Sequence, residues 1–179
     1  MFYAINRWPE AVSPFFYFLS ECTKWKPVRF TLVGIFLAML AWSRTRRAAI
    51  YIIIAFPLAN ELCDVLKAGF KVLRPSVELS DAIIRVNKLT SFGTASAHSA
   101  NMAAVAFVMT TCLGWKWGIG WILIAFFTGL SRIYVGVHYP SQVLLGWICG
   151  SLVAFLVIKA GDALALWFKA RREVRLAAH

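Results

Sequence analysis

Residues 142–168 read QVLLGWICGSLVAFLVIKAGDALALWF, and Lys159 and Asp162 are the only charged residues in this run. About 20 apolar residues in a helix cross the ~30 Å hydrocarbon core of a bilayer, so the run predicts a transmembrane helix. The whole chain of 179 residues has the same character, with 60% hydrophobic and 15% charged residues, whereas soluble domains carry about 25% charged residues. The composition excludes an ordinary soluble domain and predicts a single membrane-embedded domain over residues 1–179.

Further apolar runs precede this one, and the fold class expected from them is an all-α integral membrane bundle with five transmembrane helices. The expected crossings are residues 27–43, 48–66, 97–113, 117–130 and 142–168. Residues 1–26 are aromatic-rich but interrupted by charges and prolines, which indicates an amphipathic segment lying in the membrane interface. This segment lacks the pattern of a cleaved signal peptide, so we expect it to be retained.

Two polar segments, residues 67–96 and 131–141, fall on the same side of a five-helix bundle. The first is too long for a simple connection and is expected to be an active-site loop. The basic tail, residues 169–179, falls on the other side. Lysines and arginines are nearly balanced between the sides, but discounting those suited to bind an anion makes the tail side cytoplasmic. We therefore expect a bacterial inner-membrane protein whose site faces the periplasm or exterior.

The net charge of +11 favours anionic lipid as the counterpart, because no basic stretch with interleaved aromatics stands apart from the apolar runs, and no nucleic-acid partner is expected. The four cysteines are far apart and form no metal-binding pattern. We interpret them as small buried hydrophobic residues; they are Cys22, Cys63, Cys112 and Cys149.

The side that holds the two polar segments collects cations, hydroxyls and imidazoles at predicted helix ends. Arginine binds phosphate oxygens in a bidentate manner, and the N-terminus of a helix supplies free N–H groups, as at Ser96. Two histidines, His98 and His138, permit hydrolysis through a phosphohistidine, one as nucleophile and one as proton donor. The residue types therefore predict a phosphate site at the membrane surface.

Three ordered motifs resemble those of the type 2 phosphatidic acid phosphatases, a family of integral membrane lipid phosphatases. The family pattern K-x6-R-P is matched in full by Lys67-AGFKVL-Arg74-Pro75. The pattern P-S-G-H appears as Ala95-Ser96-Ala97-His98, and S-R-x5-H-x3-D appears as Ser131-Arg132-IYVGV-His138-YPS-Gln142. The resemblance covers residues 61–150.

The resemblance implies a role for each matched residue. Lys67, Arg74 and Arg132 would clamp the phosphate, and Ser96 and the backbone N–H of Ala97 would bind its oxygens. His98 would be the general acid and His138 the nucleophile. Neither a metal ion nor another cofactor is implied.

Two departures from the family pattern affect this assignment. Ala97 stands where the family has glycine and still offers its N–H, provided that its φ is negative. Gln142 replaces the aspartate that orients the nucleophilic histidine; its carbonyl can accept the same hydrogen bond but adds no negative charge. Either the rate is lowered or another acid substitutes. Glu61 and Asp64 are the candidates for such a substitution, although pairing with Lys67 or Lys71 explains them more simply.

We therefore expect a metal-independent lipid phosphatase that hydrolyses a phosphate or diphosphate on a membrane phospholipid or polyprenyl lipid. Undecaprenyl diphosphate is the favoured substrate, and lipid A 1-phosphate and phosphatidylglycerophosphate are compatible. One alternative is a phosphotransferase that passes the same phosphoryl group to a second lipid or sugar. Another is a degenerate protein that only binds lipid phosphates, although a binder has no use for two histidines.

Overall fold

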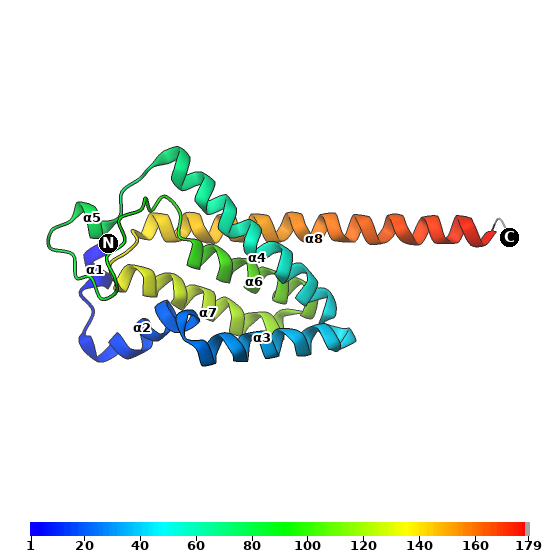
Figure 1. Ribbon diagram of the computed structural model, residues 1–179, viewed down its shortest axis with the longest axis horizontal. Coiled ribbons are helices and arrows are strands. Elements are labelled where there is room, and N and C mark those ends of the chain that lie inside the picture. Colours follow the sequence, from blue (N-terminus) through cyan, green and yellow to red (C-terminus); the bar gives the residue numbers. More distant parts are fainter. Residues whose placement is uncertain (178–179) are drawn as a thin grey trace.

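A computed structural model of the protein describes residues 1–177, and these residues form an all-helical bundle. Figure 1 shows the longer helices lying side by side, with the short N-terminal helices and α5 gathered at one end. The α-helices are Phe2–Asn6 (α1), Ser13–Glu21 (α2), Lys26–Ala41 (α3), Ser43–Phe70 (α4), Pro75–Glu78 (α5), Ala97–Leu113 (α6), Trp115–Tyr134 (α7) and Pro140–Ala177 (α8); the 3-10 turns are Glu10–Val12 (η1) and Cys22–Lys24 (η2).

Three of the five expected crossings are clear membrane spans. Within residues 1–177, the stretches long and apolar enough to cross a bilayer begin at α4, α7 and α8. In contrast, α6 has 17 residues and α3 has 16, which at 1.5 Å per residue gives only about 25 Å. Both helices have nearly the expected bounds, but of the five expected crossings these two are not clear membrane spans; α3 ends at the extended Trp42 and α6 at Gly114, whose φ is +89°. The chain is a multi-pass membrane protein.

Close contact between α6 and α8 fixes how the N-terminal ends of these two helices lie relative to each other. A Cβ on Gly146 would lie 2.5 Å from the carbonyl oxygen of Ser96, and one on Gly150 would overlap that of Ala100. Small residues spaced four apart let membrane helices approach closely. As a result the start of α8 lies beside the start of α6, where the N–H of Ser96 donates to the carbonyl of Gln142 at 2.9 Å.

The N-terminal segment packs on the bundle, in addition to any contact with the membrane interface expected for residues 1–26. Contacts join α1 and α2 to α7. The fully buried Asn6 donates to the carbonyls of Ile83 and Tyr134 at 2.8 and 3.0 Å and accepts from the N–H of Ile83 at 3.0 Å. Two part-buried hydrogen bonds therefore tie the N-terminus to the polar loop at Ile83, and one buried hydrogen bond ties it to the end of α7 at Tyr134.

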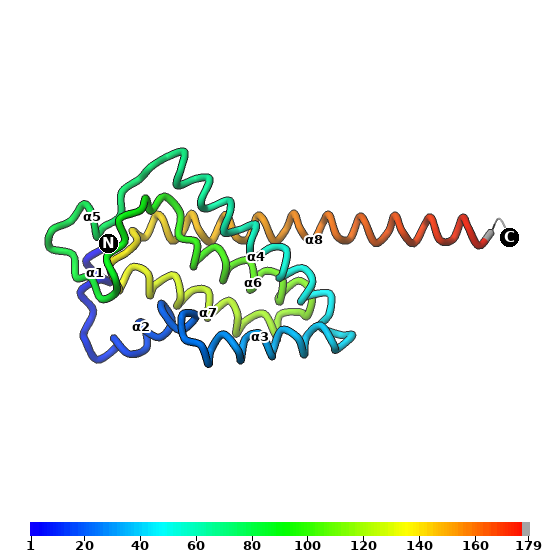
Figure 2. The backbone as a smooth tube through the Cα atoms, viewed as in Figure 1, coloured from blue at the N-terminus to red at the C-terminus, as the bar shows by residue number. Residues whose placement is uncertain are grey.

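The polar loop begins later than expected, and the tail is helical. α4 continues through Lys67 and ends at Phe70, where Lys71 adopts a left-handed conformation with φ of 51°. Figure 2 shows α8 extending far beyond the other helices, at the end opposite the N-terminus. The expected basic tail forms the last turns of this helix up to Ala177, and residues 178–179 lie outside the described residues.

Candidate active site

The centre of the candidate site is His138, which lies between α7 and α8 with 3% of its surface exposed. Its Nε2 lies 2.8 Å from Nη1 of Arg74, and its Nδ1 lies 3.0 Å from Oε1 of Gln142. Since an arginine has only donors, Nε2 must be the acceptor of this pair, and Nδ1 carries the proton and donates to Gln142. The contacts therefore define the tautomer that a nucleophilic Nε2 requires.

The side-chain amide of Gln142 is held with its oxygen toward His138. Its Oε1 also accepts from the N–H of Tyr139 at 3.1 Å, and its Nε2 donates to the carbonyl of Leu73 at 2.8 Å. In a flipped amide the NH2 group would face the N–H groups of His138 and Tyr139, and the oxygen would face the carbonyl oxygen of Leu73. The three contacts therefore assign a single orientation to the amide. The wrong tautomer, one possible consequence of glutamine at this position, does not arise here.

Arg74 reaches His138 from the loop that follows α4, and its side chain is held by backbone carbonyls. Its Nε donates to Ser91 at 2.7 Å and its Nη1 to Val137 at 3.1 Å. Behind it lies Gly93, where a Cβ would come within 2.6 Å of Cγ of Arg74 and 2.9 Å of Oε1 of Gln142. A side chain at position 93 would therefore push both residues out of place.

Burial and positive charge both act on the ionisation of the site. Burial, followed by the charges of Arg74 and Arg132, holds the pKa of His138 well below its usual value. Burial and the charge of Arg132 lower the pKa of Arg74 to about 10. At neutral pH the imidazole is therefore neutral while Arg74 remains a cation, which is the combination suited to a nucleophile beside an anion-binding group.

Arg132, at the end of α7, is buried against the end of α2. Its Nη1 donates to the carbonyl of Ser20 at 3.2 Å and to the Ser20 hydroxyl, and lies 3.5 Å from Oε1 of Glu21. Its Nε is buried and has no acceptor among the described residues. A buried donor without a partner is costly, so a ligand oxygen at this position would relieve the cost.

The N-terminus of α6 presents the second motif. Ser96 caps the helix, its hydroxyl oxygen accepting from the N–H and the hydroxyl of Ser99 at 3.4 and 3.0 Å. The hydroxyl proton of Ser96 stays free to donate. Lys71 is the single non-glycine with positive φ in residues 1–177, so Ala97 meets the condition set for it and can present its N–H. His98 is half-buried in the same turn.

Lys67 lies in the last turn of α4 and is paired with an acid from its own helix. Its Nζ is 2.7 Å from Oδ1 of Asp64, whose other oxygen accepts from Asn60 at 3.0 Å. The expected pairing of Asp64 with Lys67 is therefore present. Because Gln142 already binds Nδ1 of His138, the hypothesis that Asp64 or Glu61 replaces the missing aspartate is wrong.

Sequence reasoning missed the contribution of α2 and η2 to the site. Glu21 bridges Arg132 and Lys24, whose Nζ lies 2.5 Å from Oε2 of Glu21. Arg132 is 112 positions from Ser20 and 111 positions from Glu21, so no local sequence pattern links it to α2. The single available signal was Glu21, the one charged residue of α2.

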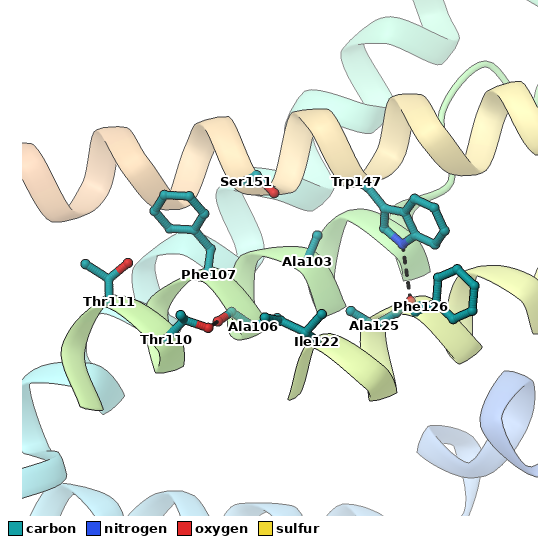
Figure 3. A pocket seen from close by; sticks show the side chains of 10 residues that line it. All are labelled: Ala103, Ala106, Phe107, Thr110, Thr111, Ile122, Ala125, Phe126, Trp147 and Ser151. Carbon is teal, nitrogen blue, oxygen red and sulfur yellow. Dashed lines mark hydrogen bonds between the residues drawn. The ribbon is translucent and has the colours of Figure 1, made fainter. Parts of the chain in front are cut away.

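An apolar cavity of about 360 Å³ lies between α6, α7 and α8 (Figure 3), and neither His98 nor His138 lines it. At one end the indole N–H of Trp147 donates to the carbonyl of Ala125 at 3.2 Å, and its ring stacks on Phe126. Thr110 satisfies its hydroxyl within its own helix. The lining offers no cation for a phosphate, so this cavity suits hydrocarbon and lies outside the candidate active site.

The bundle and its buried cations define a membrane protein with a candidate anion-binding site, and comparison with known proteins assigns the family. The sequence model of the PAP2 superfamily matches residues 47–165, more than half of the chain. The chain belongs to this superfamily, as its three motifs indicated.

Curated relatives have different named substrates. An undecaprenyl-diphosphatase of Sulfolobus acidocaldarius is 33% identical over 123 residues, which cover 68% of this chain and 59% of that protein. A lipid A 4'-phosphatase of Bacteroides thetaiotaomicron is 29% identical over 155 residues, covering 80% of this chain and 69% of that one. The alignment thus spans less than two thirds of the archaeal relative.

A solved structure shares the fold. The crystal structure of Aquifex aeolicus LpxE superposes with a TM-score of 0.76 at 23% identity, covering 88% of this chain and 92% of that one. At this level of identity the similarity shows the fold alone.

Proposed function

We propose that the protein is a lipid phosphatase that cleaves a phosphate or diphosphate group from a membrane lipid through a phosphohistidine on His138. The observation that carries the proposal is the state of His138. Its Nε2 is an acceptor, its Nδ1–H is engaged by Gln142, and Arg74 lies 2.8 Å from the nucleophilic nitrogen. A protein that only bound phosphate would need the cations but no oriented imidazole.

In the first half-reaction the phosphate oxygens draw Arg74 away from Nε2 and supply an acceptor for Nε of Arg132. Nε2 of His138 then attacks phosphorus, forming an N–P bond while the P–O bond to the lipid breaks. The leaving oxygen takes a proton from His98, which has to be protonated for this step. Burial and nearby cations lower the pKa of His98 in the protein alone, and the negative charge of a bound phosphate would raise it again. Ser96 and the N–H of Ala97 would bind the non-bridging oxygens, which gain charge in the transition state.

In the second half-reaction a water molecule attacks the phosphohistidine. His98 accepts a proton from the water, the N–P bond breaks, and inorganic phosphate leaves. His138 and His98 thereby return to their starting states without a metal ion. Gln142 stabilises the positively charged imidazole less than a carboxylate would, because its oxygen carries only a partial charge.

Substrate class and orientation are the finer parts of the proposal. A polyprenyl diphosphate such as undecaprenyl diphosphate is favoured, and the name of the archaeal relative supports this choice. Arg47 at the start of α4 pairs with Asp162 of α8 at 2.5 Å, so the basic start of α4 and the basic tail lie at one end of the bundle. With that end in the cytoplasm, the site opens to the periplasm or exterior.

The test is phosphate release by detergent-purified protein from undecaprenyl diphosphate, lipid A and phosphatidylglycerophosphate in the presence of EDTA. We expect release from at least one lipid, its loss in His138→Ala, and an acid-labile, alkali-stable phosphoenzyme in the wild type. Binding without release would support the degenerate binder. Transfer of the phosphoryl group to an added lipid or sugar alcohol, in preference to water, would support a phosphotransferase.

A further inference from the structure

The end of α2 and the η2 turn add a charged cluster to the candidate site that the three motifs do not contain. Oε1 of Glu21 lies 3.5 Å from Nη1 of Arg132, and Oε2 of the same carboxylate lies 2.5 Å from Nζ of Lys24. The hydroxyl of Ser20 donates to Oε1 at 3.2 Å. One carboxylate therefore holds two cations, and the cluster keeps a net positive charge.

The two cations differ in exposure. The side chain of Arg132 is 4% exposed and that of Glu21 is 9% exposed, whereas that of Lys24 is 60% exposed. Arg132 and Glu21 are thus fixed in the interior of the candidate site. Their burial costs desolvation energy, whereas an ion pair that only anchored the chain at the surface would not have this cost. Lys24 lies at the rim, and its flexible side chain can turn from Glu21 to an arriving anion.

The position of Lys24 relative to the two buried arginines indicates which part of a substrate it would meet. Arg74 and Arg132, which would clamp the transferred phosphate, are buried, so the rest of the substrate has to extend from them toward the surface. Lys24 is exposed and is joined to Arg132 through the carboxylate of Glu21. Lys24 is therefore placed to meet the leaving group, which is the part of the substrate attached to the transferred phosphate.

The charge of the leaving group separates two classes of substrate. With a lipid monophosphate, His98 protonates an alcohol oxygen and the leaving group is neutral. With a lipid diphosphate, the leaving group is a lipid phosphate that keeps its own negative charge. A cation beside the leaving group therefore stabilises the leaving group of a diphosphate but not the neutral leaving group of a monophosphate.

Building on the proposed lipid phosphatase activity, we propose that Lys24, held by Glu21, binds the lipid-linked phosphate of a diphosphate substrate and selects diphosphates over monophosphates. His138 attacks the terminal phosphorus, and the N–P bond forms as the bridging P–O bond breaks. The bridging oxygen leaves on the lipid phosphate and takes the proton of His98. Lys24 balances the charge of that phosphate throughout the step.

The experiment compares Lys24→Met with the wild type on two substrates of equal chain length, farnesyl diphosphate and farnesyl monophosphate. The matched control is Lys26→Met, which removes the same charge from an exposed position two residues away. Hydrogen bonds to charged groups contribute about 1.5–3 kcal/mol. Because about 1.4 kcal/mol corresponds to a tenfold change in rate, we expect kcat/KM for the diphosphate to fall about 10- to 150-fold in Lys24→Met, with less than about a threefold change for the monophosphate.

Two further results complete the test. Lys24→Arg should recover most of the diphosphate activity, and Lys26→Met should leave both activities near those of the wild type. Equal losses on both substrates, no loss on either, or a wild type that cleaves only the monophosphate would overturn the role of Lys24 while leaving a His138-dependent phosphatase intact. If the wild type released phosphate from neither substrate nor the longer lipids, the proposed function itself would fail.

Discussion

Replacing Gln142 with leucine tests whether the nucleophile depends on its neutral acceptor. Leucine is of similar bulk but leaves the proton on Nδ1 of His138 without the oxygen that lies 3.0 Å away. That hydrogen bond becomes charge-assisted when Nε2 takes the phosphoryl group, and such bonds contribute about 1.5–3 kcal/mol. Because about 1.4 kcal/mol corresponds to a tenfold change in rate, we expect kcat to fall about 10- to 150-fold.

Gln142→Glu is the matched control, since it keeps the length of the side chain and the acceptor. It loses the donor to the carbonyl of Leu73 and adds a negative charge next to His138. We expect kcat at or above that of the wild type. The acid limb of its pH–rate profile should move to higher pH, because a nearby negative charge raises the pKa of the imidazole.

The assay is the rate of phosphohistidine formation in a single turnover, followed by rapid quenching at alkaline pH, with thermal unfolding measured in parallel. Leucine also removes the partners of the Leu73 carbonyl and the Tyr139 N–H, so the comparison is made below the unfolding transition of the weaker variant. A folded Gln142→Leu protein with unchanged phosphorylation rate would refute the tautomer argument. A loss in Gln142→Glu as large as in Gln142→Leu would assign the effect to the Leu73 contact instead.

Three further outcomes are expected from the same geometry. The acid limb of kcat/KM should lie below pH 6.5, the usual pKa of histidine, because burial and cations hold the pKa of His138 down; Arg74→Met removes one cation and should move the limb to higher pH. Gly150→Leu forces α6 and α8 apart and should lower the free energy of unfolding by about 1–3 kcal/mol, measured by thermal unfolding, whereas Gly34→Ala, with no atom within 4 Å of the new Cβ, should not destabilise. Asp64→Asn removes a half-exposed ion-pair partner and should change phosphate release less than about threefold; a loss as large as that of His138→Ala would restore Asp64 as the missing acid.

The sequence predicts those parts of the site that are encoded by short motifs. The arginine in the first motif and the histidine and glutamine in the third meet in the structure, since motif spacing and alternating helix direction place them at one end of the bundle. Arg74, His138 and Gln142 are in direct contact. The amide orientation of Gln142 could not be predicted, because it depends on the Leu73 carbonyl, 69 positions away.

Helix lengths and the role of the N-terminal segment needed the three-dimensional structure. Hydropathy places the ends of α3 and α6 to within two residues, but α4 and α7 extend at both ends beyond the expected ranges 48–66 and 117–130, because the helix continues past its apolar part. The segment before α3 has the composition of an interfacial anchor. Its contribution to the site rests on Asn6 and Glu21, single polar residues whose partners lie far along the chain.

The contact between Arg74 and Nε2 of His138 keeps the nucleophilic nitrogen engaged until a substrate arrives. The lone pair that would attack phosphorus is occupied by the same guanidinium that would bind the substrate. An electrophile without negatively charged oxygens cannot compete for Arg74 and meets a nucleophile that is already engaged. Discrimination between anionic substrates and other reactive molecules is thus exerted at the attacking atom, and the imidazole becomes reactive only when a phosphate has released it.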